Sequence, residues 1–153
     1  MKKLKVLVLM ILIILLSACG SKKEVIDEDQ FISIMTNKGF NIVNVENQFE
    51  KYGYFEEAFV ALDKNGNYQI EFYELEDDNY ALSFYNNNKS IFESSKADSS
   101  MYTSVDFDKN NKYTLTTETE YKVISRIEDT VIYLNVDKIY KEEIIKILKE
   151  LGY

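Results

Sequence analysis

Histidine, proline and tryptophan are absent from this 153-residue chain, which has one cysteine and five glycines. Without histidine, and with Cys19 as the sole thiol, it lacks the side chains for a Ser-His-Asp triad, an imidazole metal site or thiol catalysis. The glycines are dispersed, so there is no glycine-rich phosphate loop. The sequence therefore predicts a protein that is not an enzyme and has no cofactor.

Aromatic and acidic residues, by contrast, are plentiful. Twelve tyrosines and nine phenylalanines supply the apolar area of a packed core and argue against disorder. The chain has 26 acidic and 18 basic residues. Because residues 1–18 hold three of the basic residues and none of the acidic ones, the remainder carries a formal charge of −11. Such a surface disfavours nucleic acid as a partner.

The first twenty residues have the layout of an export signal. Three lysines precede an apolar run from Val6 to Leu16, and Ser17, Ala18 and Cys19 follow. This run is shorter than the roughly 20 residues that span a bilayer as a helix. The segment resembles the lipobox of bacterial lipoproteins, which implies cleavage after Ala18 and lipid attachment to the sulfur of Cys19. An ordinary signal peptide, with Cys19 incidental, is the alternative.

The resemblance also implies the domain organisation and the location. Residues 1–18 are expected to be a signal peptide, residues 19–28 a lipidated cysteine and short tether, and residues 29–153 a single domain. The lipid on Cys19 would anchor the protein to the outer face of the cell membrane, since two acyl chains give stable attachment.

Hydrophobic periodicity predicts an α+β fold. Three helices are expected, over residues 29–38, 77–93 and 138–151, and Gly39 and Gly152 are expected to cap the first and last. Alternating patterns predict strands over residues 40–45, 58–63, 68–75, 101–107, 113–118, 120–127 and 130–136. The result is one antiparallel sheet of about six or seven strands in the element order αβββα-ββββα.

A weak internal duplication is one interpretation of this order. Residues 62–70 resemble residues 107–115, and the apolar positions before Gly39 match those before Gly152. The alternative is that asparagine-rich hairpins and glycine-capped amphipathic helices resemble one another without common descent.

One turn has part of the pattern of a calcium-binding EF-hand loop. Asp63, Asn65, Asn67 and Glu74 fall on ligand positions. However, the sixth position, which requires glycine, is Tyr68, and the flanking residues alternate as strands. We therefore expect an ordinary hairpin turn and no calcium site.

Two groups of residues are candidates for partner binding. Tyr52, Tyr54 and Phe55 lie with Phe49 around Gly53, in a connection where no periodic core requires aromatic rings. These rings either form a binding patch or cover the end of the core. The chain's only arginine, Arg126, could recognise a carboxylate of a partner or form an ion pair within the domain.

These observations favour a non-enzymatic binding or interaction module on the membrane, whose partner is an envelope protein. The alternative is a small hydrolase or small-ligand carrier that uses carboxylates and tyrosines. That function would need a deep pocket with convergent polar groups.

Overall fold

A computed structural model describes residues 25–153, which form one antiparallel sheet of seven strands and three α-helices. The α+β class and the sheet of about seven strands are therefore confirmed. The helices are α2 (Glu28–Asn37), α3 (Asp78–Ser94) and α4 (Lys141–Glu150). The strands are β1 (Asn41–Asn44), β2 (Phe55–Leu62), β3 (Gln69–Leu75), β4 (Met101–Phe107), β5 (Asn110–Thr116), β6 (Glu120–Ile127) and β7 (Thr130–Asp137). Three short 3-10 helices, η1 (Glu46–Gln48), η2 (Glu50–Tyr52) and η3 (Lys138–Tyr140), complete the elements.

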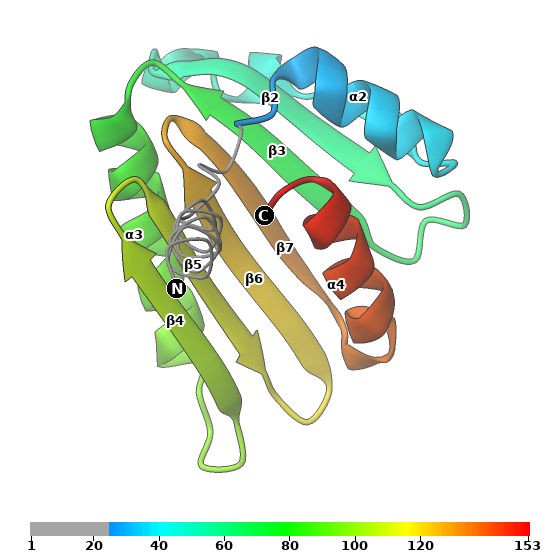
Figure 1. Ribbon diagram of the computed structural model, residues 1–153, viewed down its shortest axis with the longest axis vertical. Coiled ribbons are helices and arrows are strands. Elements are labelled where there is room, and N and C mark those ends of the chain that lie inside the picture. The colour runs from blue at the N-terminus through cyan, green and yellow to red at the C-terminus, as the bar shows by residue number, and fades with distance from the viewer. Residues whose placement is uncertain (1–24) are drawn as a thin grey trace, which may run out of the picture.

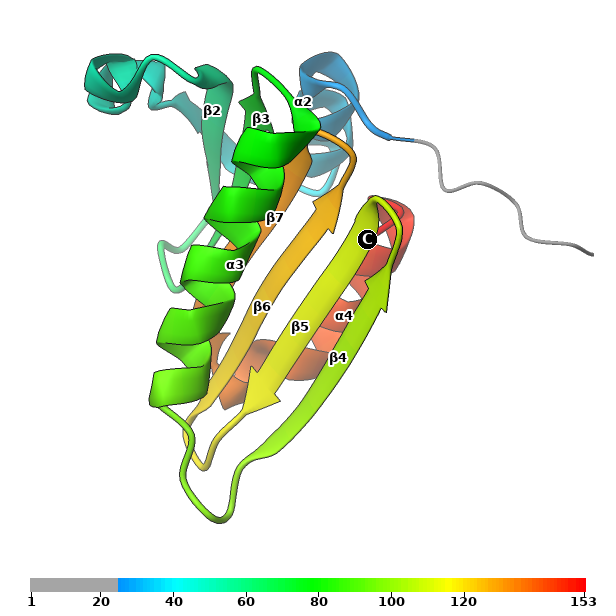
Figure 2. The same cartoon turned by 90° about the vertical axis from the view of Figure 1, so that its left-hand side faces the viewer.

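The strands lie in the order β1-β2-β3-β7-β6-β5-β4, so the last strand in the sequence occupies the middle of the sheet. Helices α2 and α4 cover one face, and α3 crosses the other (Figures 1 and 2). We call these the α2/α4 face and the α3 face. The molecule thus has three layers, with the sheet between two sets of helices.

Each face of the sheet has its own hydrophobic core. The core of the α2/α4 face includes Phe31, Met35, Ile70, Phe72, Val123, Ile132, Leu134, Ile144 and Leu148. The core of the α3 face includes Tyr73, Leu75, Ala81, Tyr85, Phe92, Tyr113, Leu115, Ile124 and Val131. Strand β6, beside the central β7, is buried along nearly its whole length because both faces are covered there.

The ends of α2 and α4 explain their glycines. Gly39 has φ +86°, and the following Phe40 N–H donates to the Met35 carbonyl at 3.0 Å. Gly152 has φ +81°, and Tyr153 N–H donates to the Leu148 carbonyl at 2.8 Å. Both helices therefore end in a Schellman motif, which requires a left-handed residue that only glycine adopts without strain.

The domain begins earlier than residue 29. The Asp27 carboxylate caps α2 by accepting the N–H of Gln30 at 2.8 Å, and the Gln30 side chain accepts the N–H of Asp27 in return. Ile26 is buried in the core of the α2/α4 face. The expected tether is therefore shorter than residues 19–28, because its last residues belong to the folded domain.

The two hairpins that resemble each other in sequence differ in length. The β2–β3 connection runs over residues 63–68, whereas Asp108 and Lys109 alone connect β4 to β5. The internal duplication stays a prediction.

Candidate functional site

A hollow of about 470 Å³ opens on the α3 face of β1, β2 and β3. Helix α3 packs against β3, β7, β6 and β5, and no α-helix among residues 25–153 covers β1 on this side (Figure 2). The residues that line the hollow are Val43, Val45, Gln48, Phe49, Val60, Leu62, Gln69, Glu71 and Tyr73. The strand register places Val43, Val60 and Glu71 in one row across the three strands. The floor is thus mainly aliphatic, with amide and carboxylate groups toward one side.

The polar side of the hollow is organised around the Glu71 carboxylate. It accepts the Tyr73 hydroxyl at 2.5 Å and the Gln69 side-chain N–H at 2.7 Å. Burial raises the pKa of the Tyr73 phenol, and the negative charge of Glu71 raises it further. The phenol therefore stays protonated and donates its hydrogen to Glu71. The Glu71 carboxylate accepts both hydrogen bonds, and these bonds fix the orientation of Gln69, Glu71 and Tyr73 at this side of the hollow.

An aromatic cluster forms one wall of the hollow and extends beyond it. Phe49, in the segment of η1 and η2, lies 4.6 Å from Phe55 and 5.4 Å from Tyr73 between ring centroids. Tyr54 stacks on Tyr80 of α3 at 5.0 Å with an interplanar angle of 6°. These contacts hold the segment of residues 46–54 against both the sheet and α3.

The predicted aromatic site residues take two roles in this cluster. Tyr54 and Phe55 are partly buried and pack on the core of the α3 face, whereas Tyr52 is 48% exposed. The neighbouring Tyr80 is 42% exposed. The rings of Tyr54 and Phe55 therefore cover the core. The exposed rings of Tyr52 and Tyr80 form an aromatic rim beside the hollow. The role of these residues in partner binding stays a prediction.

Arg126 lies apart from the hollow. It is on β6, faces α3 and is 3% exposed. Its Nε and Nη1 atoms have no hydrogen-bond partner among the described residues. Burial lowers the pKa of this guanidinium, and the negative charges of Asp78, Asp108 and Asp129 oppose that change. A partner would have to displace α3 to reach Arg126, and its role in binding also stays a prediction.

The EF-hand-like turn is held by its own aspartate. The Asp63 carboxylate accepts the backbone N–H groups of Asn65, Asn67 and Tyr68. These bonds lower the pKa of Asp63. Glu74 is five residues beyond the start of β3, about 17 Å along the strand, so its carboxylate cannot join Asp63 around one ion. Residues 25–153 contain no cluster of carboxylates that could hold a metal ion.

Sequence reasoning did not identify the hollow, because its lining comes from four separate segments that only the strand register brings together. Cys19 lies outside the described residues, and so does the whole lipobox-like segment. In the part of the chain that the structure describes, no helix is long and apolar enough to cross a membrane.

Comparison with protein-family models, with curated proteins and with solved structures gives no match for this chain. The function therefore has to be argued from the site itself.

Proposed function

We propose that this protein is a lipid-anchored bacterial surface protein and that its domain is a non-enzymatic interaction module. The observation that carries the proposal is the open hollow on the α3 face, with an exposed aromatic rim at Tyr52 and Tyr80. A rigid sheet that presents aliphatic floor, aromatic rings and a few fixed polar groups suits recognition of a protein segment. Gln69, Glu71 and Tyr73 in the hollow are hydrogen-bonded to one another, which favours binding over catalysis.

The place where the N-terminal segment joins the folded domain suggests where the partner lies. Glu28 at the start of α2 lies near enough to Glu57 of β2 to raise the pKa of that carboxyl, and Glu57 is two residues from Phe55 in the aromatic cluster. The segment from a lipidated Cys19 to Val25 would reach only about 20 Å when fully extended. The aromatic rim would therefore sit at the end of the domain nearest the bilayer. We infer that the partner is an envelope protein exposed just outside the membrane.

Photo-crosslinking in cells tests this proposal. A photoreactive phenylalanine analogue at Tyr52 or Val43 should capture a membrane protein, whereas the same analogue at Ile91, 62% exposed on α3, should not. The Val43→Asp variant should weaken capture from position 52 at least about tenfold, because it places a charge on the aliphatic floor. Ile91→Asp is the matched control and should leave capture unchanged. Equal capture at all three positions would refute a binding site at the hollow.

The alternative of a small-ligand carrier is tested by the same variants. If Val43→Asp abolishes binding of a small molecule found with the purified protein, and no protein is captured at Tyr52, the carrier function replaces the interaction module.

A further inference from the structure

Strand β4 is an edge of the sheet with little of the usual protection, since Asp106 is its only charged residue. No strand among residues 25–153 pairs with its outer side. It has seven residues in continuous register with β5, without proline, lysine or a bulge. Met101, Val105 and Phe107 are 64%, 55% and 74% exposed on the α2/α4 face. The opposite edge, β1, has only four residues. An exposed apolar edge of this length is a template for pairing with another strand.

The hydrogen bonds of β5 identify the free backbone groups of β4. The Lys109 carbonyl accepts from Glu128 N–H, and Thr117 N–H donates to the Glu120 carbonyl, each at 2.9 Å. Odd-numbered residues of β5 therefore direct their backbone groups to β6, and even-numbered ones direct theirs to β4. Their partners on β4 are the odd-numbered residues. It follows that Tyr102, Ser104 and Asp106 direct their N–H and C=O groups to the open edge.

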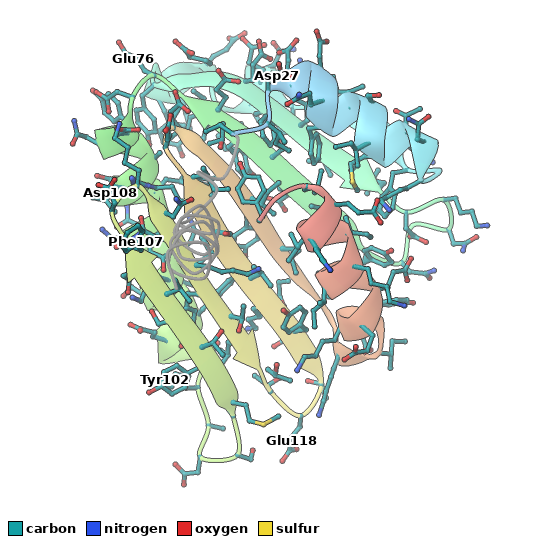
Figure 3. The ribbon with its side chains drawn as sticks, viewed as in Figure 1. Asp27, Glu76, Tyr102, Phe107, Asp108 and Glu118 are labelled. Carbon is teal, nitrogen blue, oxygen red and sulfur yellow. The ribbon has the colours of Figure 1, made fainter. Side chains whose placement is uncertain are left out.

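Charge around this edge favours a second copy of the same chain. The domain as a whole is strongly acidic, but residues 96–112 contain three lysines and three aspartates and are locally neutral. Lys96 Nζ lies 3.6 Å from the centroid of the Tyr102 ring at one end of β4. Asp106, which Lys89 of α3 contacts at 3.4 Å, and Asp108 lie at the other end. Figure 3 shows Tyr102 and Phe107 at opposite ends of this outer strand. Two antiparallel copies would therefore bring a cation of each copy toward the aspartates of the other.

We propose that β4 pairs antiparallel with β4 of a second copy, with the two-fold axis at Ser104. All the free backbone groups of Tyr102, Ser104 and Asp106 then find partners in the second copy. On the α2/α4 face, Met101 lies opposite Phe107 of the second copy, so the exposed apolar side chains cover one another. The two sheets become one continuous sheet of fourteen strands, given seven in each copy.

The positions of the aspartates disfavour two of the alternative registers. A centre at Asp106 would place two Asp106 carboxylates directly opposite, and a centre at Tyr102 would place Asp106 opposite Asp98. Both arrangements are destabilising, because like charges directly opposite repel. Centring on Ser104 places Asp106 opposite Tyr102, beside Lys96. Centres at Thr103 or Val105 would also keep the backbone pairing, but they leave two residues of β4 beyond the end of the partner strand. Centring on Ser104 pairs all seven residues of Met101–Phe107.

Cysteine crosslinking of the full chain in detergent micelles, in a Cys19→Ser background, tests the register. Hydrogen-bonded antiparallel residues have Cα atoms about 5.5 Å apart, which suits a disulfide. Ser104→Cys should therefore form a disulfide dimer at least about tenfold faster than Val105→Cys, because two Val105 positions would be offset by two residues and lie beyond about 7 Å. Equal rates in the two variants would overturn the proposed register.

Sedimentation equilibrium of the same chain, without added cysteines, tests the dimer itself. Tyr102→Asp would face the Asp106 carboxylate of the second copy twice in each dimer and should raise the dissociation constant at least about tenfold. Tyr102→Phe should not change it. A monomeric native chain at about 100 μM would overturn the proposal, as would a Tyr102→Asp chain that dimerises like the native one.

Discussion

At the scale of single residues, Glu57 has an unusual ionisation for a carboxyl group. Its carboxyl is partly buried, and burial is the main cause that raises its pKa to about 7. A hydrogen bond with the Glu28 carboxyl and the negative charges of Glu28, Glu46 and Glu74 raise it further. The folded protein therefore keeps a proton on Glu57 at a pH where an unfolded glutamate has released it.

This proton makes the stability of the domain depend on pH. Since the folded state binds the proton more tightly, the free energy of unfolding falls as the pH rises from about 4.5 to about 7 and changes little above that range. Glu57→Gln should remove the cost and stabilise the protein at pH 8 by about 1–2 kcal/mol, allowing for solvent screening. At pH 4.5 the variant and the native protein should be equally stable.

Urea denaturation at the two pH values measures the effect. Glu56→Gln, a change at the exposed neighbouring residue, is the control and should be stabilised less. A Glu57→Gln variant with no gain at pH 8 would show that Glu57 does not carry the proton.

At the scale of elements, α3 depends on a single side chain at its start. The Asp77 carboxylate accepts the N–H groups of Asn79 at 2.7 Å and Tyr80 at 2.9 Å. Tyr80 in turn stacks on Tyr54. This cap therefore positions both the helix and the aromatic rim of the hollow.

Removing the cap should weaken the whole domain. Asp77→Ala should lower the free energy of unfolding by about 1 kcal/mol, and Asp77→Asn by much less, because asparagine caps helices almost as well as aspartate. Urea midpoints at pH 7 measure both changes. If the two variants lose equal stability, the side-chain cap is not the cause.

The sequence predicted elements well where a local signal decided them. The Asn65-Gly66 pair predicted the hairpin between β2 and β3, and the strand expected over residues 120–127 is β6, Glu120–Ile127. The sequence predicted the burial of side chains less well, because burial depends on which elements pack together in the fold. The apolar periodicity of residues 77–93 places Ile91 on the inner side of α3, whereas the structure leaves it 62% exposed. Burial of Arg126 could not be predicted either, since it depends on α3 crossing β6.

In the candidate site, too, features with a local sequence signal could be predicted, and features that depend on strand pairing could not. The unusual position of the aromatic residues around Gly53 could be recognised from the sequence, because no periodic pattern explained them. The hollow could not, since Val43, Val60 and Glu71 become neighbours only through strand pairing. The 3-10 helices that carry Phe49 toward Tyr73 also leave no clear sequence pattern.

At the scale of the whole molecule, the anchor can be tested separately from the domain. Cys19→Ser should no longer incorporate labelled fatty acid, and its signal should stay uncleaved by a lipoprotein-specific peptidase. The physical reason is that the thiol that accepts the acyl chains, which hold a protein stably at a bilayer, is missing in the variant. Ser17→Ala, which keeps a small residue before the cysteine, is the control. A fully processed Cys19→Ser chain that stays with the membrane would contradict the lipobox.

The central place of β7 has a consequence for when the domain can fold. β3 and β6 belong to separate meanders, and each finds its inner neighbour only when β7 pairs with both. Pairing of β3 with β7 joins residues separated by about sixty positions, and such non-local contacts form slowly. In a chain that becomes available from its N-terminus onward, β7, which joins the two halves of the sheet, is thus available only after the other six strands. Until then the sheet stays in two separate pieces, β1-β2-β3 and β6-β5-β4.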